Sequence, residues 1–320
     1  MDTQYQSSLA AGSVGTRAGS ARIAAFRWLA SALALCVYLL AILGSWVRIN
    51  SDGMSCPTWP ECSSHSLLTL HGFPFLESLH RLIAGPIVGP LTLAVLAMAW
   101  VNRRELPQAA RGAWAIIVFL ICQIALGGIT IFASNDPPSV TAHWTCGMLL
   151  LASIIVVAVL AWGPSSAEQL AGRSRVSATP WLWLVALAAL ATTAMGAYVS
   201  SSGFGLTCAG FPSCDGRWFG LPWPQGAQMT HRALAYGVFF CAVLAVIATH
   251  RTERRDLRAI ALVAIGLVAV QILLGAANVA GHLPTLLREA HAANAALLYS
   301  TYVVLLARSA FLPQARPLRA

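Results

Sequence analysis

Long apolar stretches alternate with short polar segments along almost the whole chain of 320 residues. A helix that crosses the hydrocarbon core of a bilayer needs about 20 consecutive, mainly apolar residues. Eight stretches reach this length, at about 24–47, 77–101, 112–133, 141–162, 180–202, 228–249, 259–280 and 288–311. The pattern therefore predicts an all-α membrane protein with eight transmembrane helices and no separate soluble domain.

The composition agrees with this class and excludes a soluble globular protein. Hydrophobic residues make up 58% of the chain, charged residues only 10%, and the mean hydropathy is +0.70. A soluble domain carries about 25% charged residues to cover its surface. The net charge of +9 would suit a nucleic-acid partner, so the distribution of that charge must be considered.

The basic residues lie mainly on one side of the expected membrane, and all 20 are arginine. Fifteen lie in the N-terminal segment, the even-numbered loops and the C-terminal end: Arg17, Arg22, Arg27, Arg103, Arg104, Arg111, Arg173, Arg175, Arg251, Arg254, Arg255, Arg258, Arg308, Arg316 and Arg319. Five lie on the opposite side: Arg48, Arg81, Arg217, Arg232 and Arg288. Cytoplasmic loops are enriched in basic residues, so both termini are expected in the cytoplasm of a bacterial-type plasma membrane. The charge then requires no nucleic acid.

The polar segments divide the chain into five parts. Residues 1–22 are rich in Ser, Ala and Gly, too polar for a signal peptide, and are expected to form a disordered cytoplasmic tail. An N-terminal four-helix bundle (23–165), a cytoplasmic linker (166–179), a C-terminal four-helix bundle (180–311) and a cytoplasmic tail (312–320) are expected to follow.

The two bundles carry the same motifs in the same order. Gly44-Ser-Trp-Val-Arg48 matches Gly196-Ala-Tyr-Val-Ser200 at an offset of 152, His80-Arg81 matches His231-Arg232 at 151, and Gln123–Gly128 matches Gln271–Ala276 at 148. The offset changes only in loops, as expected for a tandem duplication. Because four helices precede the second copy, the copies should be parallel repeats related by an axis along the membrane normal.

Four histidines occupy matching places in the two copies. His80 and His143 lie near the starts of apolar runs in the first copy, as do His231 and His291 in the second. Ionisable side chains within a bilayer are costly and usually functional. Two facing imidazoles are the usual axial ligands of a low-spin haem, so we predict two bis-histidine haem sites towards the external face.

Two alternatives apply to these histidines. Any one alone could be a buried side chain bonded to a backbone carbonyl, although four at repeat-related places make coincidence a poor explanation. A structural zinc site would need four close ligands, usually with thiolates, and each bundle offers only two histidines.

Each copy also has residues suited to the rim and faces of a haem. Arg81 and Arg232 directly follow the first histidine of each copy, where a guanidinium could pair with a propionate or simply extend to the membrane interface. The small residues Gly127-Gly128 and Gly275-Ala276 could admit a flat macrocycle or only allow close helix packing.

The copies differ at one informative position. Glu77 lies one helical turn before His80, whereas Gln228 is its counterpart before His231. A carboxylate beside a haem ligand could exchange protons, and an amide cannot. If one half of the protein is reactive, this difference favours the first half. The alternative to a catalytic role is that Glu77 is a solvated residue at the start of a helix.

Two cysteine pairs of equal spacing lie in loops expected to be external, in CPTWPEC and CAGFPSC. The external compartment is oxidising, so Cys56–Cys62 and Cys208–Cys214 are predicted disulfides, either structural or redox-active. The other cysteines lie in apolar runs and are expected to be packing residues: Cys36, Cys122, Cys146 and Cys241.

Together these motifs resemble those of the haem A synthase family from about Arg27 to Arg308. The resemblance rests on the Gly-x-x-Val-Arg end of the first helix, CPTWPEC, ESLHR, QIALGG, the His143 helix and their counterparts in the second copy. It implies an enzyme that oxidises the C8 methyl of haem O to the formyl group of haem A, for cytochrome oxidase. The implied route is two hydroxylations to a gem-diol, followed by loss of water.

Residue by residue, the resemblance implies that His80 and His143 flank the substrate haem, with Glu77 as the acidic catalytic residue. His231 and His291 would ligate a haem b cofactor that passes electrons. The implied partners are haem O, membrane lipid, an electron donor, haem O synthase and further copies of this chain in a homo-oligomer.

Two other functions remain open on the sequence. A bis-histidine, cytochrome b-type electron-transfer protein explains four histidines equally well, but it gives no reason for the difference between Glu77 and Gln228. A haem transporter or chaperone with exchangeable haem in one half is the other.

Overall fold

A computed structural model of the chain describes residues 2–56, 58–60, 73–163 and 178–312. Its helices are α1 (Asp2–Ile49), α2 (Phe73–Leu82), the π-helix η2 (Ile83–Val88), α3 (Gly89–Val101), α4 (Pro107–Phe132), α5 (Pro137–Trp162), α7 (Thr179–Ser201), the 3₁₀ turn η3 (Phe204–Leu206), α8 (Trp223–His250), α9 (Arg255–Ala280) and α10 (Thr285–Phe311). In these ranges β pairing is limited to an isolated bridge between Cys214 and Arg217. The predicted all-α class is confirmed.

Eight helical segments of the described chain are long and apolar enough to cross a membrane: Gly19–Ile49, Phe75–Val101, Pro107–Phe132, Pro137–Trp162, Thr179–Ser201, Trp223–His250, Arg255–Ala280 and Thr285–Phe311. They coincide with the eight predicted helices and end within two residues of the predicted positions. Several begin earlier than predicted, because their first turns contain proline or polar residues. Proline suits the first turn of a helix but interrupts an apolar pattern.

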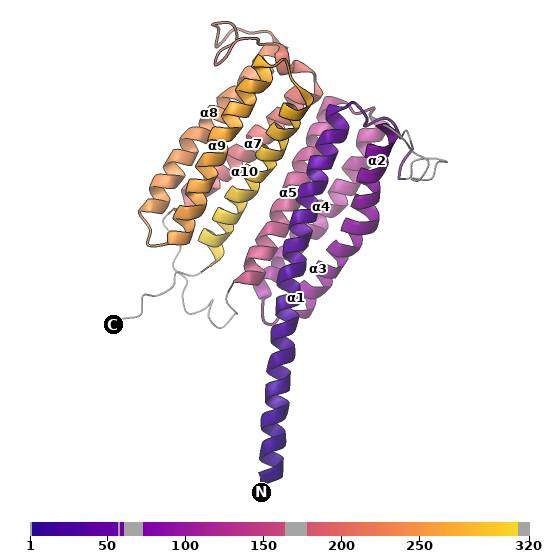
Figure 1. Ribbon diagram of the computed structural model, residues 1–320, viewed down its shortest axis with the longest axis vertical. Coiled ribbons are helices and arrows are strands. Elements are labelled where there is room, and N and C mark those ends of the chain that lie inside the picture. The colour runs from indigo at the N-terminus through magenta and orange to yellow at the C-terminus, as the bar shows by residue number, and fades with distance from the viewer. Residues whose placement is uncertain (1, 57, 61–72, 164–177, 313–320) are drawn as a thin grey trace.

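The helices form two groups that stand side by side, α1 to α5 and α7 to α10 (Figure 1). α5 packs against α7 and α10, and α1 packs against α10, so these four helices form the interface between the groups. In the most apolar stretch of α5, 56% of the residues are buried, whereas in that of α9 only 17% are buried. α5 is therefore central, and α9 presents an apolar outer surface suited to lipid.

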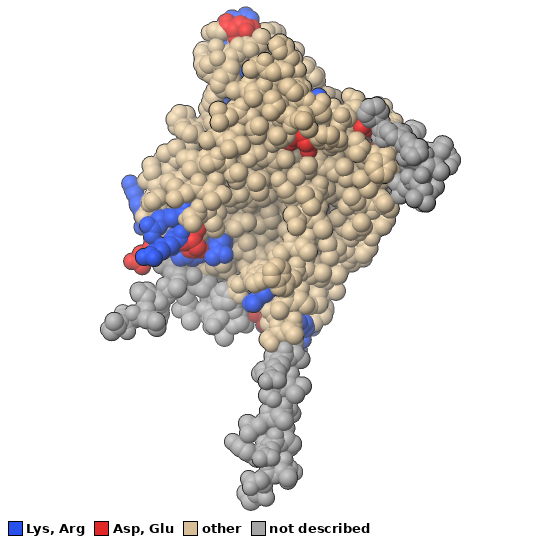
Figure 2. Space-filling view, in the orientation of Figure 1, with Lys and Arg blue, Asp and Glu red and all other residues tan. Residues whose placement is uncertain are grey.

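Charged side chains are sparse along the middle of the molecule and gather at its ends (Figure 2). At the end where both termini lie, Asp256 pairs with Arg254 and Arg308, and Arg22 pairs with Glu105. The opposite end carries residues 50–56, 58–60 and 202–222, and we call it the loop end. This separation of charge from an apolar middle fits an integral membrane protein.

The N-terminal segment differs from the expectation of disorder. α1 begins at Asp2 and projects beyond the rest of the molecule (Figure 1). The apolar span of this helix starts only at Gly19. Once a membrane span is helical, each further residue adds a hydrogen bond without a new nucleus, so a polar, Ala-containing segment extends the helix at little cost.

The second span of each group is built differently. In the first group, α2, η2 and α3 follow one another, and the π-helix contains Pro86. Proline removes one backbone donor and crowds the preceding turn, and a π-helical turn accommodates both effects. In the second group the matching helix α8 is continuous, so this interruption belongs to the second span of the first group.

Candidate functional site

His80 and His231 each lie against a glycine on the preceding span. An added Cβ on Gly44 would lie 2.9 Å from Cε1 of His80, and one on Gly196 would lie 2.8 Å from Cε1 of His231. Such separations are too short for any side chain, so only glycine lets the imidazole pack here. The same helix-to-helix contact is thus found in both groups.

His143 and His291 occupy a second pair of matching places. A Cβ on Gly127 would lie 3.3 Å from Cε1 of His143, and one on Gly275 would lie 3.2 Å from Cε1 of His291. The space beside these glycines is therefore taken by imidazole rings. The expectation that they admit a macrocycle gains no support from this packing.

Two glutamines touch these histidines, and the sequence did not point to them as site residues. Nε2 of Gln123 lies 3.2 Å from Nε2 of His143, and Nε2 of Gln271 lies 3.2 Å from Nε2 of His291. Asn294 also donates to Oε1 of Gln271 at 2.7 Å. The repeated QIALGG and QILLGA motifs contained the signal, because each begins with this glutamine.

The histidines of each group lie near one another. The ring centroids of His231 and His291 are 6.4 Å apart, with an angle of 72° between the ring planes. His80 and His143 are close enough to interact electrostatically. Two imidazoles bound to one metal with metal–nitrogen bonds of about 2 Å would have centroids roughly 6 Å apart, so the His231–His291 separation fits axial ligation.

The donor set also fits a metal held in a tetrapyrrole. Among the described residues no group of three or more His, Cys, Asp or Glu side chains could hold a metal ion. Each group therefore offers two imidazoles, and a metal bound there would need its other ligands from a bound group. Among the described residues, Nδ1 of His80, His143 and His291 is buried and makes no hydrogen bond of good geometry, so a bound group could still order these rings.

Glu77 is buried, with 4% of its surface exposed, so it is not the solvated residue that the alternative interpretation required. Its Oε2 accepts hydrogen bonds from Oγ of Ser55 at 2.8 Å and from the backbone N–H of Cys56 at 2.9 Å. Its Oε1 pairs with the guanidinium of Arg81. The carboxylate is thus held one helical turn towards the loop end from His80.

Gln228 makes the matching contact in the second group. Its Oε1 accepts from the backbone N–H of Cys208 at 2.7 Å and from Oγ1 of Thr207 at 3.0 Å. Its Nε2 donates to the carbonyl of Gly205 at 2.7 Å. Both residues therefore hold a cysteine loop to a helix. Holding the loop does not require a carboxylate, because the amide of Gln228 does the same in the second group.

Arg81 and Arg232 are directed at loop carbonyls. Arg81 donates to the carbonyls of Thr58 and Cys56 as well as to Glu77. Arg232 is buried and donates to four loop carbonyls, those of Cys208, Gly210, Pro212 and Ser213. Both guanidinium groups thus fix the loops, and their contact with propionates stays a prediction.

The cysteines behave as the loop spacing predicts where the structure describes them. Cys208 and Cys214 form a disulfide with an S–S distance of 2.04 Å. Cys56 is also disulfide-bonded, whereas its predicted partner Cys62 lies outside the described residues. The four cysteines expected to be packing residues are free: Cys36, Cys122, Cys146 and Cys241.

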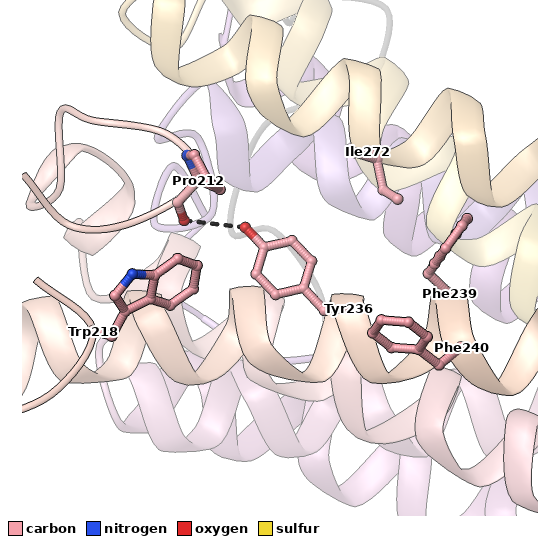
Figure 3. Close-up of a pocket in the computed structure, with 6 residues that line it drawn as sticks. All are labelled: Pro212, Trp218, Tyr236, Phe239, Phe240 and Ile272. Atoms are coloured by element: carbon pink, nitrogen blue, oxygen red, sulfur yellow. Dashed lines mark hydrogen bonds between the residues drawn. The ribbon is translucent and has the colours of Figure 1, made fainter. Parts of the chain in front are cut away.

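A cavity of about 420 Å³ opens between α8 and α9 (Figure 3). It is lined by Pro212, Trp218, Tyr236, Phe239, Phe240 and Ile272. The hydroxyl of Tyr236 donates to the carbonyl of Pro212 at 3.0 Å, which ties the loop to α8. The lining offers no histidine or carboxylate, so we assign this cavity no chemistry.

The chain is similar to known proteins over most of its length. A family model described as cytochrome oxidase assembly protein, COX15-CtaA, matches residues 8–139 and 70–303. The chain is 28% identical over 320 residues to the heme A synthase of Shewanella oneidensis, covering 87% of this chain and 94% of that protein. It is 30% identical over 267 residues to the heme A synthase of Symbiobacterium thermophilum, covering 80% and 86% of the two chains.

Proposed function

Because the chain belongs to the COX15-CtaA family of cytochrome oxidase assembly proteins, we propose that it oxidises the C8 methyl of haem O to the formyl group of haem A. Its relatives named heme A synthase identify a membrane-bound oxidoreductase. The site residues and the finer chemistry below belong to this proposal.

The observation that carries the proposal is the difference between Glu77 and Gln228. The two groups share the histidines, their glycine contacts and the glutamines that touch them. At the position one turn before the first histidine, the first group has a buried carboxylate, Glu77, where the second has the amide Gln228. A titratable group in one of two otherwise matched sites is expected where one site performs chemistry and the other carries electrons.

We assign the substrate to His80 and His143 and a haem b to His231 and His291. A haem b bound in the second group would supply electron transfer. Ser55, the Cys56 N–H and Arg81 fix the Glu77 carboxylate, whose part would be to exchange a proton at the rim of the substrate. The two cysteine loops, held by Glu77 and Gln228, would limit the access of water from the loop end.

The proposal is tested by supplying the membrane-embedded protein with haem O and analysing extracted haems by mass. Time-dependent appearance of haem A, together with stable haem b, is expected. Haem b alone, with haem O left unconverted, would instead support an electron-transfer cytochrome. Exchange of intact haem O without oxidation would support a transporter.

We also propose that the loop end is external and that both termini are cytoplasmic. The arginine distribution and the disulfides support this orientation. After reduction, a membrane-impermeant thiol reagent should label Cys208 and Cys214 in intact cells, in a chain whose four free cysteines are replaced by serine. Labelling only in inverted vesicles would contradict the orientation, and labelling without reduction would contradict the disulfides.

Gly196→Ala should weaken retention of haem b by about 10–100-fold, as expected when a group that orients a metal ligand is lost. The added methyl would lie 2.8 Å from Cε1 of His231, so the ring must move. Haem b per protein after gel filtration measures the effect. Gly237→Ala on the same helix as His231 is the control, because its methyl would meet nothing within 4 Å. Equal loss in both variants would show a general effect on packing.

A further inference from the structure

A cluster of charged residues at the interface between the two groups has no part in the mechanism so far. Arg48 lies at the end of α1, Arg288 lies in the first turn of α10, and Glu289 directly follows it. Arg48 is close enough to interact electrostatically with both residues of α10. Arg288 also reaches across the interface and donates to the carbonyl of Ile49 at 3.4 Å.

The cluster is incompletely paired. Glu289 is 7% exposed, and the ion pairs of the described residues do not include its carboxylate. The buried hydroxyl of Ser45 lies beside the carboxylate and interacts with it. None of the ion pairs among the described residues includes Arg48. Two guanidinium groups around one carboxylate leave an excess of positive charge, which is costly in a partly buried place and favours an anionic ligand.

The cluster lies next to the histidine sites. Arg48 is one helical turn beyond Gly44, the residue that packs against His80, and therefore lies on the same face of α1. Arg288 is three residues before His291, again one turn nearer the loop end. A haem held between His80 and His143 with its propionates towards the loop end would direct a carboxylate to this level.

The contact between α5 and α7, which matches the α10–α1 contact by the repeat, lacks these charges. By the repeat offsets, Ser200 matches Arg48, Val140 matches Arg288 and Thr141 matches Glu289. The positive cluster is therefore specific to the α1–α10 contact. Arg81 and Arg232 are weaker candidates for the same role, because loop carbonyls already take up their donors.

We propose that Arg48, assisted by Arg288, binds a propionate carboxylate of the substrate haem and so sets the orientation of its rim. This inference rests on the proposed function, because it takes His80 and His143 as the substrate ligands. A guanidinium fork pairs with a carboxylate in a fixed geometry, and a macrocycle fixed at one edge presents a defined methyl group elsewhere on its rim. Arg48 is a positioning residue in this proposal.

The test compares iron protoporphyrin IX with its dimethyl ester, which lacks the propionate charge. The full chain carries His231→Ala and His291→Ala, so that only the first group can bind, and binding is followed by the bis-histidine spectrum. The diacid should bind roughly 10–100-fold more tightly than the ester, as expected for loss of a hydrogen bond between charged groups. Arg48→Gln should remove this preference, whereas Arg103→Gln, an exposed arginine at the other end of the molecule, should keep it.

Three results would overturn the proposal. If the Arg48→Gln protein still binds the diacid more tightly than the ester by the same ratio as the unsubstituted protein, another group binds the propionate. In a chain with all four histidines, loss of haem b from the second group on Arg48→Gln substitution would show that Arg48 only holds the two groups together. Absence of any bis-histidine spectrum in the His231→Ala, His291→Ala chain would overturn the ligand assignment of the proposed function, and the propionate contact with it.

Discussion

Replacing Glu77 by glutamine is expected to slow the conversion of haem O to haem A by about 100- to 10,000-fold, the usual contribution of a general acid–base group. The substitution makes the first group resemble the second without touching a histidine. Gln228 shows that an amide can hold the loop, because its Oε1 accepts from the N–H of Cys208 at 2.7 Å, against 2.9 Å for Glu77 and Cys56. Haem content and the bis-histidine spectrum should therefore persist, and single-turnover conversion measures the loss.

The reciprocal substitution is the matched control. Gln228→Glu places a carboxylate at the corresponding point of the second group, which we assign to electron transfer. Turnover should stay within a few-fold of the original rate, since haem A formation does not occur there. A Glu77→Gln protein that makes haem A at the normal rate would return Glu77 to the role it shares with Gln228, that of fixing a cysteine loop.

The features that the sequence predicted well are those that depend on residues close together in the chain. Apolar length predicted all eight spans, because the bilayer imposes the same requirement on each helix. The equal spacing of Cys208 and Cys214 with Cys56 and Cys62 predicted a disulfide that the structure contains. The matching places of the histidines predicted that His231 and His291 would lie together, and their ring centroids are 6.4 Å apart, while their part as haem ligands stays a prediction.

Contacts between distant segments were harder to predict. Whether Gln123 or another side chain touches His143 depends on how α4 is rotated against α5, and hydropathy reports this rotation poorly. Arg81 and Arg232 were expected to meet propionates, because arginine at a membrane edge suits any anion. Apart from the pairing of Arg81 with Glu77, their partners in the structure are backbone carbonyls, which every residue possesses and no motif reveals.

The N-terminal segment and Glu77 illustrate two further limits. Composition predicted disorder for residues 1–22, yet a helix already formed by a membrane span extends into this segment. The sequence did not predict whether Glu77 is buried, because the loop that covers it is distant in the chain from its helix. Both outcomes depend on what lies next to a segment in space, and local composition does not report that.

Removing one histidine from each group should separate the two proposed haems. His231→Ala should lose haem b almost completely and abolish haem A formation, because electrons no longer reach the substrate. His80→Ala should keep haem b in the second group but lose the bound substrate haem and all conversion. Each imidazole is packed against a glycine, Gly196 or Gly44, so no neighbouring side chain at that contact can replace the lost ligand. Extraction with mass analysis, and reduced-minus-oxidised spectra, measure both outcomes.

His250→Ala is the matched control, since His250 lies in the last turn of the same helix as His231, is exposed, and has no counterpart in the first group. It should leave both haems and turnover unchanged. Loss of haem b from His80→Ala, with haem b retained in His231→Ala, would reverse the assignment of the two groups and make Gln228, not Glu77, the neighbour of the substrate. Retention of every haem in both variants would contradict axial ligation by these histidines. The same pair of proteins thus decides separately whether the histidines bind haem and which group is reactive.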